Sequence, residues 1–503
     1  MFAVPGRAVE SPAGASSDVE RPDPLVTVRN GRICRSGRIC RNGRIGRIGR
    51  ICRNGRTGRY DAPRTGEPGR LVGGGIRLTV TAIAVFLAVY ALIVSERIHR
   101  TLAALAGAVV VIGLGLISQH EAFSQDVVDF NVIFLLAGMM IIANILGKTG
   151  IFQWLAVEAV RRAEGRPYRA LVLVSLITAI ASAVLDNVTT VVLMTPVTFF
   201  IAQRLGMSPV PFLVSQILAS NIGGTATLIG DPPNIIVGSR LGKDFNDFLI
   251  NAAPPAIVSL VLYLVFARWL FAKELARATT ALEPDDIARL VEAERKIADP
   301  RLMRIGLAVL GATIVGFLLA RPLGLEGATI ALGGAVALMI LAREDVHEVL
   351  KEVEWSTLFF FIGLFIVVGA VVKTGVIAEL ARQAIAVTGG RPDLITMLVL
   401  WMSAVLSAIV DNIPYTITMI PLVEELGRSV PIDPVIWALV LGADLGGNAT
   451  IVGASANVVV SSMSEARGHP IGFVGYLRYG VPATILTMLV STVYLWLRFF
   501  AFG

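Results

Sequence analysis

Charged residues and cysteine are both scarce in this chain of 503 residues. Only 16% of the residues are Asp, Glu, Lys or Arg, whereas 55% are hydrophobic and the mean hydropathy is +0.72. This composition excludes an ordinary soluble globular protein and predicts a polytopic membrane protein. The three cysteines (Cys34, Cys40 and Cys52) all precede the hydrophobic part. The membrane body therefore has no thiolate with which to bind a metal or form a disulfide.

The net positive charge of the chain lies in its first 75 residues. They hold 15 arginines against 6 acidic residues, and from Arg29 to Arg59 an arginine falls at every third position. A period of three with Gly, Asn and Ser spacers cannot bury a core, so residues 1–75 are predicted to be a disordered Arg/Gly-rich tail. We favour low-complexity sequence upstream of the real start over a basic arm that touches anionic lipid or nucleic acid. No nucleic-acid partner is expected.

Two polar stretches interrupt hydrophobic segments in the body. They read SNIGGTATLIGDPPN at 220–234 and ADLGGNATIVGASAN at 443–457. Inside a bilayer, non-helical backbone persists only where it is buried in protein or lines a polar cavity. The matched pair therefore predicts a substrate site between two broken helices, at 210–241 and 433–464.

The body is an internal duplication. VDF at 128–130 matches VEW at 353–355, and SAVLDN at 182–187 matches SAIVDN at 407–412, each with an offset of 225 residues. The Gly-Gly pairs of the two polar stretches are offset by 223. Shared motifs in the same order over more than a hundred residues indicate two copies of one unit.

The hydrophobic segments predict an all-α polytopic membrane protein made of two inverted repeats. The membrane halves are 76–272 and 305–503, joined by a charged cytoplasmic loop at 273–304. Each half has a re-entrant hairpin, 170–205 and 394–427, whose arms are short for a full crossing. Three unbroken spans between the copies invert the second, and a cytoplasmic central loop places most lysines and arginines inside. We expect ten crossings in the cell membrane, the layout of an alternating-access carrier.

Four carboxylates can reach the predicted site: Asp186 and Asp411 at the hairpin tips, Asp231 in the first break and Asp444 before the second. A membrane carboxylate is costly unless it binds a cation, a partner or a proton. No Lys or Arg lies in the same stretches, so we predict coupling to H+ or Na+ and no other cofactor. The alternative is an aspartate bonded to the backbone amides of the opposite break, with a structural role.

Neutral oxygens and flexible backbone accompany these carboxylates, and about half of the polar residues are expected only to cap helix ends. Any Na+ is predicted at Asp186, Asn187, Asp411 and Asn412. The candidate site residues besides the four aspartates are Asn187, Thr190, Gly223, Gly224, Thr225, Thr227, Gly230, Asn234, Asn412, Gly446, Gly447, Asn448, Thr450, Ser455 and Asn457.

The stretch IGGTATLIGDPPNIIVGS and the paired SAVLDN and SAIVDN tips resemble the ArsB/NhaD branch of the ion transporter superfamily, with its citrate transporter-like domain. That branch includes arsenite/antimonite efflux carriers, Na+/H+ antiporters and the P protein. The resemblance covers residues 76–503 and implies an elevator-type transporter fold. It also implies a homodimer whose site is formed by the hairpin tips and the two Gly-Gly breaks. Related divalent-anion symporters carry Ser-Asn-Thr at the tips. The Asp-Asn pairs here favour cation or proton coupling.

The sequence thus predicts a proton-coupled secondary transporter of a small inorganic ion or small anion, and we favour arsenite/antimonite-type efflux. Arsenite is an uncharged trihydroxide at neutral pH, so the lack of body cysteines does not exclude it. A Na+/H+ antiporter, a sodium-coupled citrate or dicarboxylate transporter and a channel remain alternatives. An intramembrane aspartyl protease is distant, because the chain has Leu-Ile-Gly-Asp instead of Gly-x-Gly-Asp and no Tyr-Asp partner. We expect no enzyme and no catalytic residues.

Overall fold

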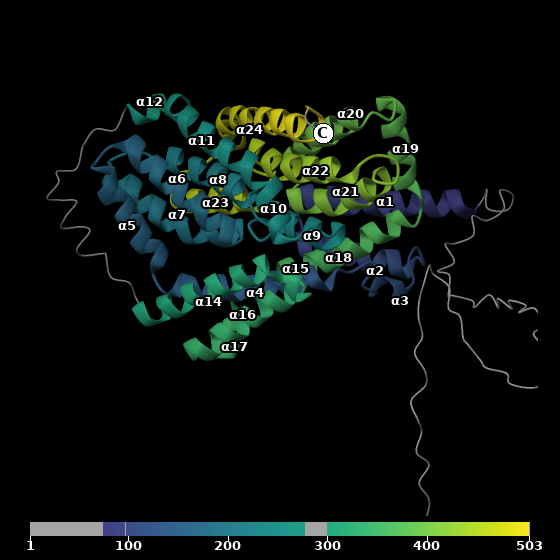
Figure 1. The fold of residues 1–503 in the computed structure, drawn as a ribbon, viewed down its shortest axis with the longest axis horizontal. Coiled ribbons are helices and arrows are strands. Elements are labelled where there is room, and N and C mark those ends of the chain that lie inside the picture. The colour runs from purple at the N-terminus through teal and green to yellow at the C-terminus, as the bar shows by residue number, and fades with distance from the viewer. Residues whose placement is uncertain (1–73, 96, 277–298, 502–503) are drawn as a thin grey trace, which may run out of the picture. The chain divides into compact units, whose positions relative to one another are not determined.

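The computed structural model describes residues 74–95, 97–276 and 299–501, and all the regular elements in these ranges are helical (Figure 1). The all-α prediction is therefore confirmed for the described residues. The tail predicted at 1–75 lies outside them except for its last two residues, and so does most of the loop predicted at 273–304.

In the first half, the described residues form five helices before the hairpin, the two helices of the hairpin, the two parts of the broken helix and three further helices. Its elements are α1 (Gly74–Ser95), α2 (Arg100–Gly113), α3 (Gln119–Ala122), α4 (Phe130–Lys148), α5 (Ile151–Ala163), α6 (Pro167–Val184), α7 (Asn187–Arg204), α8 (Val210–Gly224), α9 (Pro232–Leu241), α10 (Phe245–Asn251), α11 (Ala253–Leu270) and α12 (Ala272–Leu275).

The second half repeats this order. Its elements are α14 (Pro300–Leu318), α15 (Ala320–Leu323), α16 (Gly327–Ala342), α17 (Val346–Lys351), α18 (Trp355–Val372), α19 (Val376–Thr388), α20 (Pro392–Ile409), α21 (Asn412–Leu426), α22 (Ile432–Gly446), the 3-10 turn η1 (Gly447–Ala449), α23 (Ser455–Glu465), α24 (Phe473–Trp496) and a terminal π-helical turn η2 (Leu497–Ala501).

The two hairpins form as predicted, but their first arms are longer than expected. Proline at the first helical position starts α6 at Pro167 and α20 at Pro392, because a residue without an N–H fits the unpaired first turn. Each of these helices has 18 residues and is apolar enough to cross a membrane. The expectation that every arm is too short for a crossing is therefore wrong for α6 and α20. How deep the hairpins reach remains a prediction.

The duplication is visible in how the two halves interlock. Helix α4 of the first half packs on α16 of the second, and α18 of the second half packs on α2 of the first (Figure 1). Glycine permits both approaches. A Cβ on Gly138 would lie 2.7 Å from the backbone of Ala331, and one on Gly363 would lie 2.7 Å from the backbone of Ala104. Each repeat is thus completed by a helix of the other.

The hairpins hold the broken helices in place by equally close contacts. Helix α8 packs along α6 and α22 packs along α20. At Gly223 a Cβ would lie 2.2 Å from the carbonyl oxygen of Ala179, and at Gly446 it would lie 2.6 Å from that of Ala404. Any larger residue would push a broken helix away from its hairpin. These two contacts set the position of both breaks.

Candidate ion-binding site

The first break lies between the end of α8 and the start of α9, and an asparagine closes it. The Asn234 side chain donates through Nδ2 to the carbonyl oxygens of Gly224 at 3.1 Å and Thr227 at 2.9 Å. Gly224 and Gly230 touch across the loop, where a Cβ on Gly230 would lie 2.4 Å from the Gly224 oxygen. The hydroxyl of Thr227 donates to the carbonyl of Ala183. These groups satisfy backbone freed from helical pairing.

The second break repeats the same bonds. Asn457 donates through Nδ2 to the carbonyl oxygens of Gly447 and Thr450, both at 2.8 Å, and the Thr450 hydroxyl donates to Ala408 at 2.6 Å. Gly453 takes the place of Gly230. Thr227, Thr450 and the Nδ2 atoms of Asn234 and Asn457 therefore hold the backbone. This agrees with the expectation that part of the polar set has a structural role.

One carboxylate lies between the two hairpin tips. Asp231 is fully buried and accepts hydrogen bonds from Nδ2 of Asn187 at 2.9 Å and from Nδ2 of Asn412 at 3.3 Å. The two asparagines come from the first and second hairpins. The structure thus joins both tips and the first break at a single buried acid.

Asn221 extends this polar network into the second break. Its Nδ2 donates to Oδ1 of Asn448 and to Oδ1 of Asn457, both at 2.9 Å, and its Oδ1 accepts from Asn187 at 3.3 Å. All four asparagines are at most 3% exposed. Asn221 was absent from the predicted set. Because it precedes Asp444 by the same 223 residues that separate the Gly-Gly pairs, aligning the copies would have found it.

Asp444 is the second fully buried acid of the core. It lies beside the side chains of Asn234 and Thr225 and interacts electrostatically with Asp231. Within the described residues neither of its carboxylate oxygens makes a hydrogen bond. A buried oxygen without a partner is costly, so binding a proton or a cation would stabilise this carboxyl group.

The two hairpin tips are held differently. Asp186 caps α7 by accepting from the backbone N–H of Thr189 at 2.8 Å, and its other oxygen is buried without a partner among the described residues. Asp411 accepts from the backbone N–H of Ile413 at 3.0 Å, and its second oxygen accepts from Ser455 at 2.6 Å. Both aspartates therefore use one oxygen as a helix cap on their own hairpin, not on the opposite break.

A basic residue also reaches the site, against expectation. Arg100, the first residue of α2, lies 3.6 Å from the Asp411 carboxylate and donates to the Ser455 hydroxyl at 2.6 Å. Sequence reasoning missed it because it lies 311 residues before Asp411. Glu354, the residue before α18, interacts electrostatically with Asp186 and Arg100 and was also missed.

Two of the remaining predicted residues have buried oxygens without a hydrogen-bond partner among the described residues. Thr190 is fully buried with a free hydroxyl, and Asn187 keeps an unpaired Oδ1, in both cases counting the described residues. Among those residues no group of three or more His, Cys, Asp and Glu side chains could hold a metal ion. Na+ at the tips stays a prediction that rests on mixed neutral and acidic oxygens.

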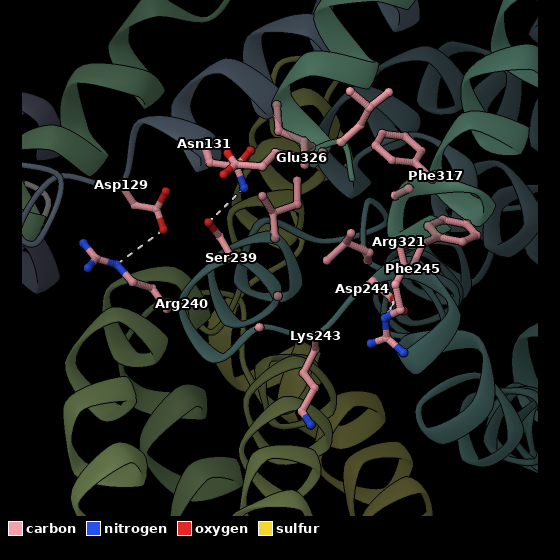
Figure 2. Close-up of a pocket in the computed structure, with 18 of the residues that line it drawn as sticks. Asp129, Asn131, Ser239, Arg240, Lys243, Asp244, Phe245, Phe317, Arg321 and Glu326 are labelled. Atoms are coloured by element: carbon pink, nitrogen blue, oxygen red, sulfur yellow. Dashed lines mark hydrogen bonds and ion pairs between the residues drawn. The ribbon is translucent and has the colours of Figure 1, made fainter. Parts of the chain in front are cut away.

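A separate cavity of about 560 Å³ opens beside the second half of α9 (Figure 2). Its wall includes Asn131, which donates to Ser239 at 3.0 Å, and Arg240, which pairs with Asp129 at 3.4 Å. The start of α16 and the α14–α15 end complete it. None of the candidate site residues lines this cavity, so it is distinct from the buried polar core.

Comparison with known proteins places this arrangement in a family. Residues 90–442 match the model of the citrate transporter family, CitMHS. The chain belongs to this family. An uncharacterised transporter of Mycobacterium tuberculosis is 44% identical over 434 residues, which is 85% of this chain and 100% of that protein. The human P protein is 34% identical over 506 residues, covering 84% of this chain and 60% of the P protein.

A solved structure has a related fold. The crystal structure of the YdaH transporter of Alcanivorax borkumensis, described as having an unusual topology, superposes with a TM-score of 0.57 at 15% identity, over 84% of this chain and 98% of that one. At this identity the likeness concerns the fold alone. The described part of the chain has eight helices long and apolar enough to cross a membrane. Together with the family match, this makes the CitMHS protein a secondary transporter that spans the membrane many times.

Proposed function

We propose that this CitMHS protein is a proton-coupled efflux carrier for a small hydroxylated solute of the arsenite or antimonite type. The observation that carries the proposal is the setting of Asp231, which is shared by asparagines of both hairpins at the meeting point of the two repeats. Among the described residues Asp231 and Asp444 have no ion pair with Lys or Arg. A core of this kind suits protons and neutral hydroxyls.

The charge balance speaks against a multivalent anion as the solute. A citrate would carry several negative charges into a core that already holds Asp231 and Asp444. The basic residue that reaches the site, Arg100, is paired with Asp411. Like charges brought together in a low-dielectric interior repel strongly. An uncharged trihydroxide can instead donate to carboxylate and amide oxygens such as those of Asn187 and Asn448.

Two inverted repeats around one core give such a carrier its two access states. Each repeat contributes one hairpin and one broken helix. The packing of α4 on α16 is matched by the packing of α18 on α2, with the roles of the two repeats exchanged. Exchange of the roles of the two repeats would open the core to one side and then to the other. Proton binding at a core acid would couple this exchange to the pH gradient.

The test is flux into proteoliposomes that contain the purified protein and a trapped pH indicator. We expect an arsenite gradient to drive protons in the opposite direction, with no requirement for Na+. Citrate should drive neither proton nor solute movement. Uptake of citrate that depends on Na+, with no response to arsenite, would contradict the proposal.

Na+/H+ exchange is the second candidate, and the first hairpin tip favours it. Three oxygens there lack partners among the described residues, namely Oδ2 of Asp186, Oδ1 of Asn187 and Oγ1 of Thr190. Acidic and neutral oxygens together are ligands that suit a hard cation. In the same vesicles a Na+ gradient applied without arsenite would move protons if this candidate is right.

A further inference from the structure

The two breaks contact each other through equivalent residues of the two repeats, with one exception. Asn221 of α8 and Asp444 of α22 occupy equivalent positions, 223 residues apart. Asn221 lies against Asn448 and Asn457 of the second break. Asp444 lies against Thr225 and Asn234 of the first break, which are the equivalents of those two residues. The surroundings correspond, but an amide on one side is a carboxyl group on the other.

The orientation of both closing asparagines is fixed by their other bonds. Nδ2 of Asn457 donates to two carbonyl oxygens at 2.8 Å, so its Oδ1 points to Asn221 and accepts from that amide at 2.9 Å. Nδ2 of Asn234 likewise donates to two carbonyls, and its Oδ1 is left buried without a partner among the described residues. Turning either amide over would set its oxygen against two carbonyl oxygens.

Asp444 therefore faces hydrogen-bond acceptors, as Asn221 does in the other repeat. The Thr225 hydroxyl has already given its hydrogen to the carbonyl of Asn221 at 2.8 Å, and Asn234 offers only Oδ1. On the first side the Asn221 amide supplies the hydrogens that such acceptors need. A charged carboxylate has no hydrogen to supply, whereas a neutral carboxylic acid has one O–H.

We propose that Asp444 carries the coupling proton, and that its acid O–H donates to Asn234 Oδ1 as the Asn221 amide donates to Asn457 Oδ1. The inference rests on the proposed proton-coupled function and assigns its proton to one residue. Release of the proton leaves carboxylate and carbonyl oxygens face to face, which pushes α22 and α9 apart at the core. Protonation thus favours the closed contact between the breaks, and deprotonation favours its opening.

Among the described residues, no Lys or Arg forms an ion pair with Asp444 that would neutralise its carboxylate in place of a proton. Asp231, before α9, interacts with Asp444 but is itself acidic. Helix α22 also packs on α8, which has no titratable residue, and on α20, α21 and α24. Arg240 of α9 is held by Asp129, and Tyr415 donates to Ser403. The other titratable or charged residues of these packed helices are Asp393, Glu424, Glu425, Tyr476, Arg478, Tyr479 and Tyr494.

The direct test is Asp444→Asn, which gives the second copy the amide that the first copy already has. We expect the variant to fold, because the new Nδ2 can donate to Asn234. Accumulation driven by a pH gradient should fall by about tenfold or more relative to solute counterflow, which needs no net proton movement. The proton signal should disappear. Full pH-driven accumulation by D444N would overturn the proposal.

A swapped variant and a matched control sharpen the result. N221D/D444N moves the carboxyl group to the equivalent position of the other copy, against Asn448 and Asn457, and should recover part of the proton signal that D444N loses. D433N removes a carboxylate from the exposed start of the same helix, where Asp433 pairs with Lys243. It should leave proton-coupled flux unchanged. Loss of coupling in D433N equal to that in D444N would overturn the assignment.

Infrared difference spectroscopy separates this proposal from the broader function. In detergent the carbonyl band of a protonated carboxylic acid should appear as the pH is lowered, persist in D186N and D231N, and be absent from D444N. If the unmodified protein moves no protons with any solute, the proposed function fails, and the band still tells whether Asp444 is protonated. If protons move but the band persists in D444N, this inference alone fails. Should D444N not fold, survival of the band in both D186N and D231N supports the assignment, and its loss in either contradicts it.

Discussion

The two hairpin tips carry the same Asp-Asn pair, yet the two halves treat them differently. At the first tip Asp186 keeps a buried oxygen without a partner among the described residues. At the second tip the matching oxygen of Asp411 is taken by Ser455 and Arg100. The asparagines behave alike, since both donate to Asp231. Duplication has thus preserved the Asp-Asn pair of the tips while the partners of the two aspartates have diverged. We therefore propose that the first tip binds solute and that the second has a structural role.

The largest expected effect comes from the contacts that the two halves share. Gly223→Ala would place a Cβ 2.2 Å from the carbonyl oxygen of Ala179, and Gly446→Ala would place one 2.6 Å from that of Ala404. Neither backbone can yield easily, so each variant should lose about 1–3 kcal/mol or more of stability. Thermal unfolding followed by size-exclusion chromatography measures the loss.

A matched control for these variants is Gly311→Ala in α14, where a new Cβ would meet nothing within 4 Å. Alanine is favoured over glycine inside a helix by about 0.5–1 kcal/mol, so G311A should be neutral or slightly stabilising. Equal losses of stability in all three variants would show that the two break glycines tolerate a Cβ no worse than Gly311 does. A loss in only one of G223A and G446A would show that the two repeats depend on these contacts unequally.

Substitutions at the two tips should have different effects on solute affinity. Asp186→Asn keeps the helix cap, because asparagine caps as well as aspartate, but removes a charge that nothing else in the described residues neutralises. We expect solute affinity to fall by about tenfold, equivalent to about 1.4 kcal/mol. Asp411→Asn should change affinity much less. Concentration dependence of flux for both variants measures the difference, and equal losses of affinity would contradict the division of roles.

The second tip should instead show its role in stability. Arg100 and Asp411 are partly screened, with side chains 33% and 14% exposed, so we expect a coupling energy of about 1 kcal/mol between them. A double-mutant cycle with R100Q, D411N and R100Q/D411N measures it through thermal unfolding. The double variant should be less destabilised than the sum of the single variants. Strict additivity would show that the pair contributes nothing.

The smallest effect is expected at a pair of surface contacts that also follow the duplication. Lys373 at the end of α18 pairs with Glu121 at 2.6 Å, and Lys148 at the end of α4 pairs with Glu352 at 3.1 Å. The Lys373 ammonium and Ser118 lower the pKa of Glu121 from 4.5 to about 2. Because the folded pKa is the lower one, the contribution is complete above about pH 4.5 and is lost as the pH falls toward 2.

Glu121→Gln should therefore unfold like the unmodified protein at low pH and differ slightly from it at pH 7. Comparison of unfolding temperatures from neutral to acidic pH checks this. The site is exposed, so salt should remove the difference. A difference that grows as the pH falls would contradict the assignment of the lowered pKa.

Much of the arrangement could be predicted because short motifs carried it. The Gly-Gly pairs marked both breaks, the Asp-Pro-Pro-Asn run marked the first break, and the repeated Leu/Val-Asp-Asn marked both tips. The lengths of α6 and α20 were underestimated because the proline at the start of each was not used as a boundary. Arg100 could not be found, since only the folded chain brings the start of α2 to a tip 311 residues later.

The division of labour within the core was also beyond the sequence. All four aspartates were candidates for the site, yet Asp231 is shared by two amides, Asp411 is paired, Asp186 caps a helix and Asp444 faces acceptors. These differences depend on which hydrogen atoms each neighbour has left to donate, a property of the three-dimensional hydrogen-bond network.

Proton movement in vesicles that contain either the unmodified protein or Asp444→Asn tests the central claim most directly. That claim is that two copies of one unit meet around buried acids and drive solute export with protons. The account predicts a pH signal opposed to solute flux in the unmodified protein and none in a folded D444N. An undiminished pH signal in D444N, or rapid solute flux without any pH signal in the unmodified protein, would contradict it.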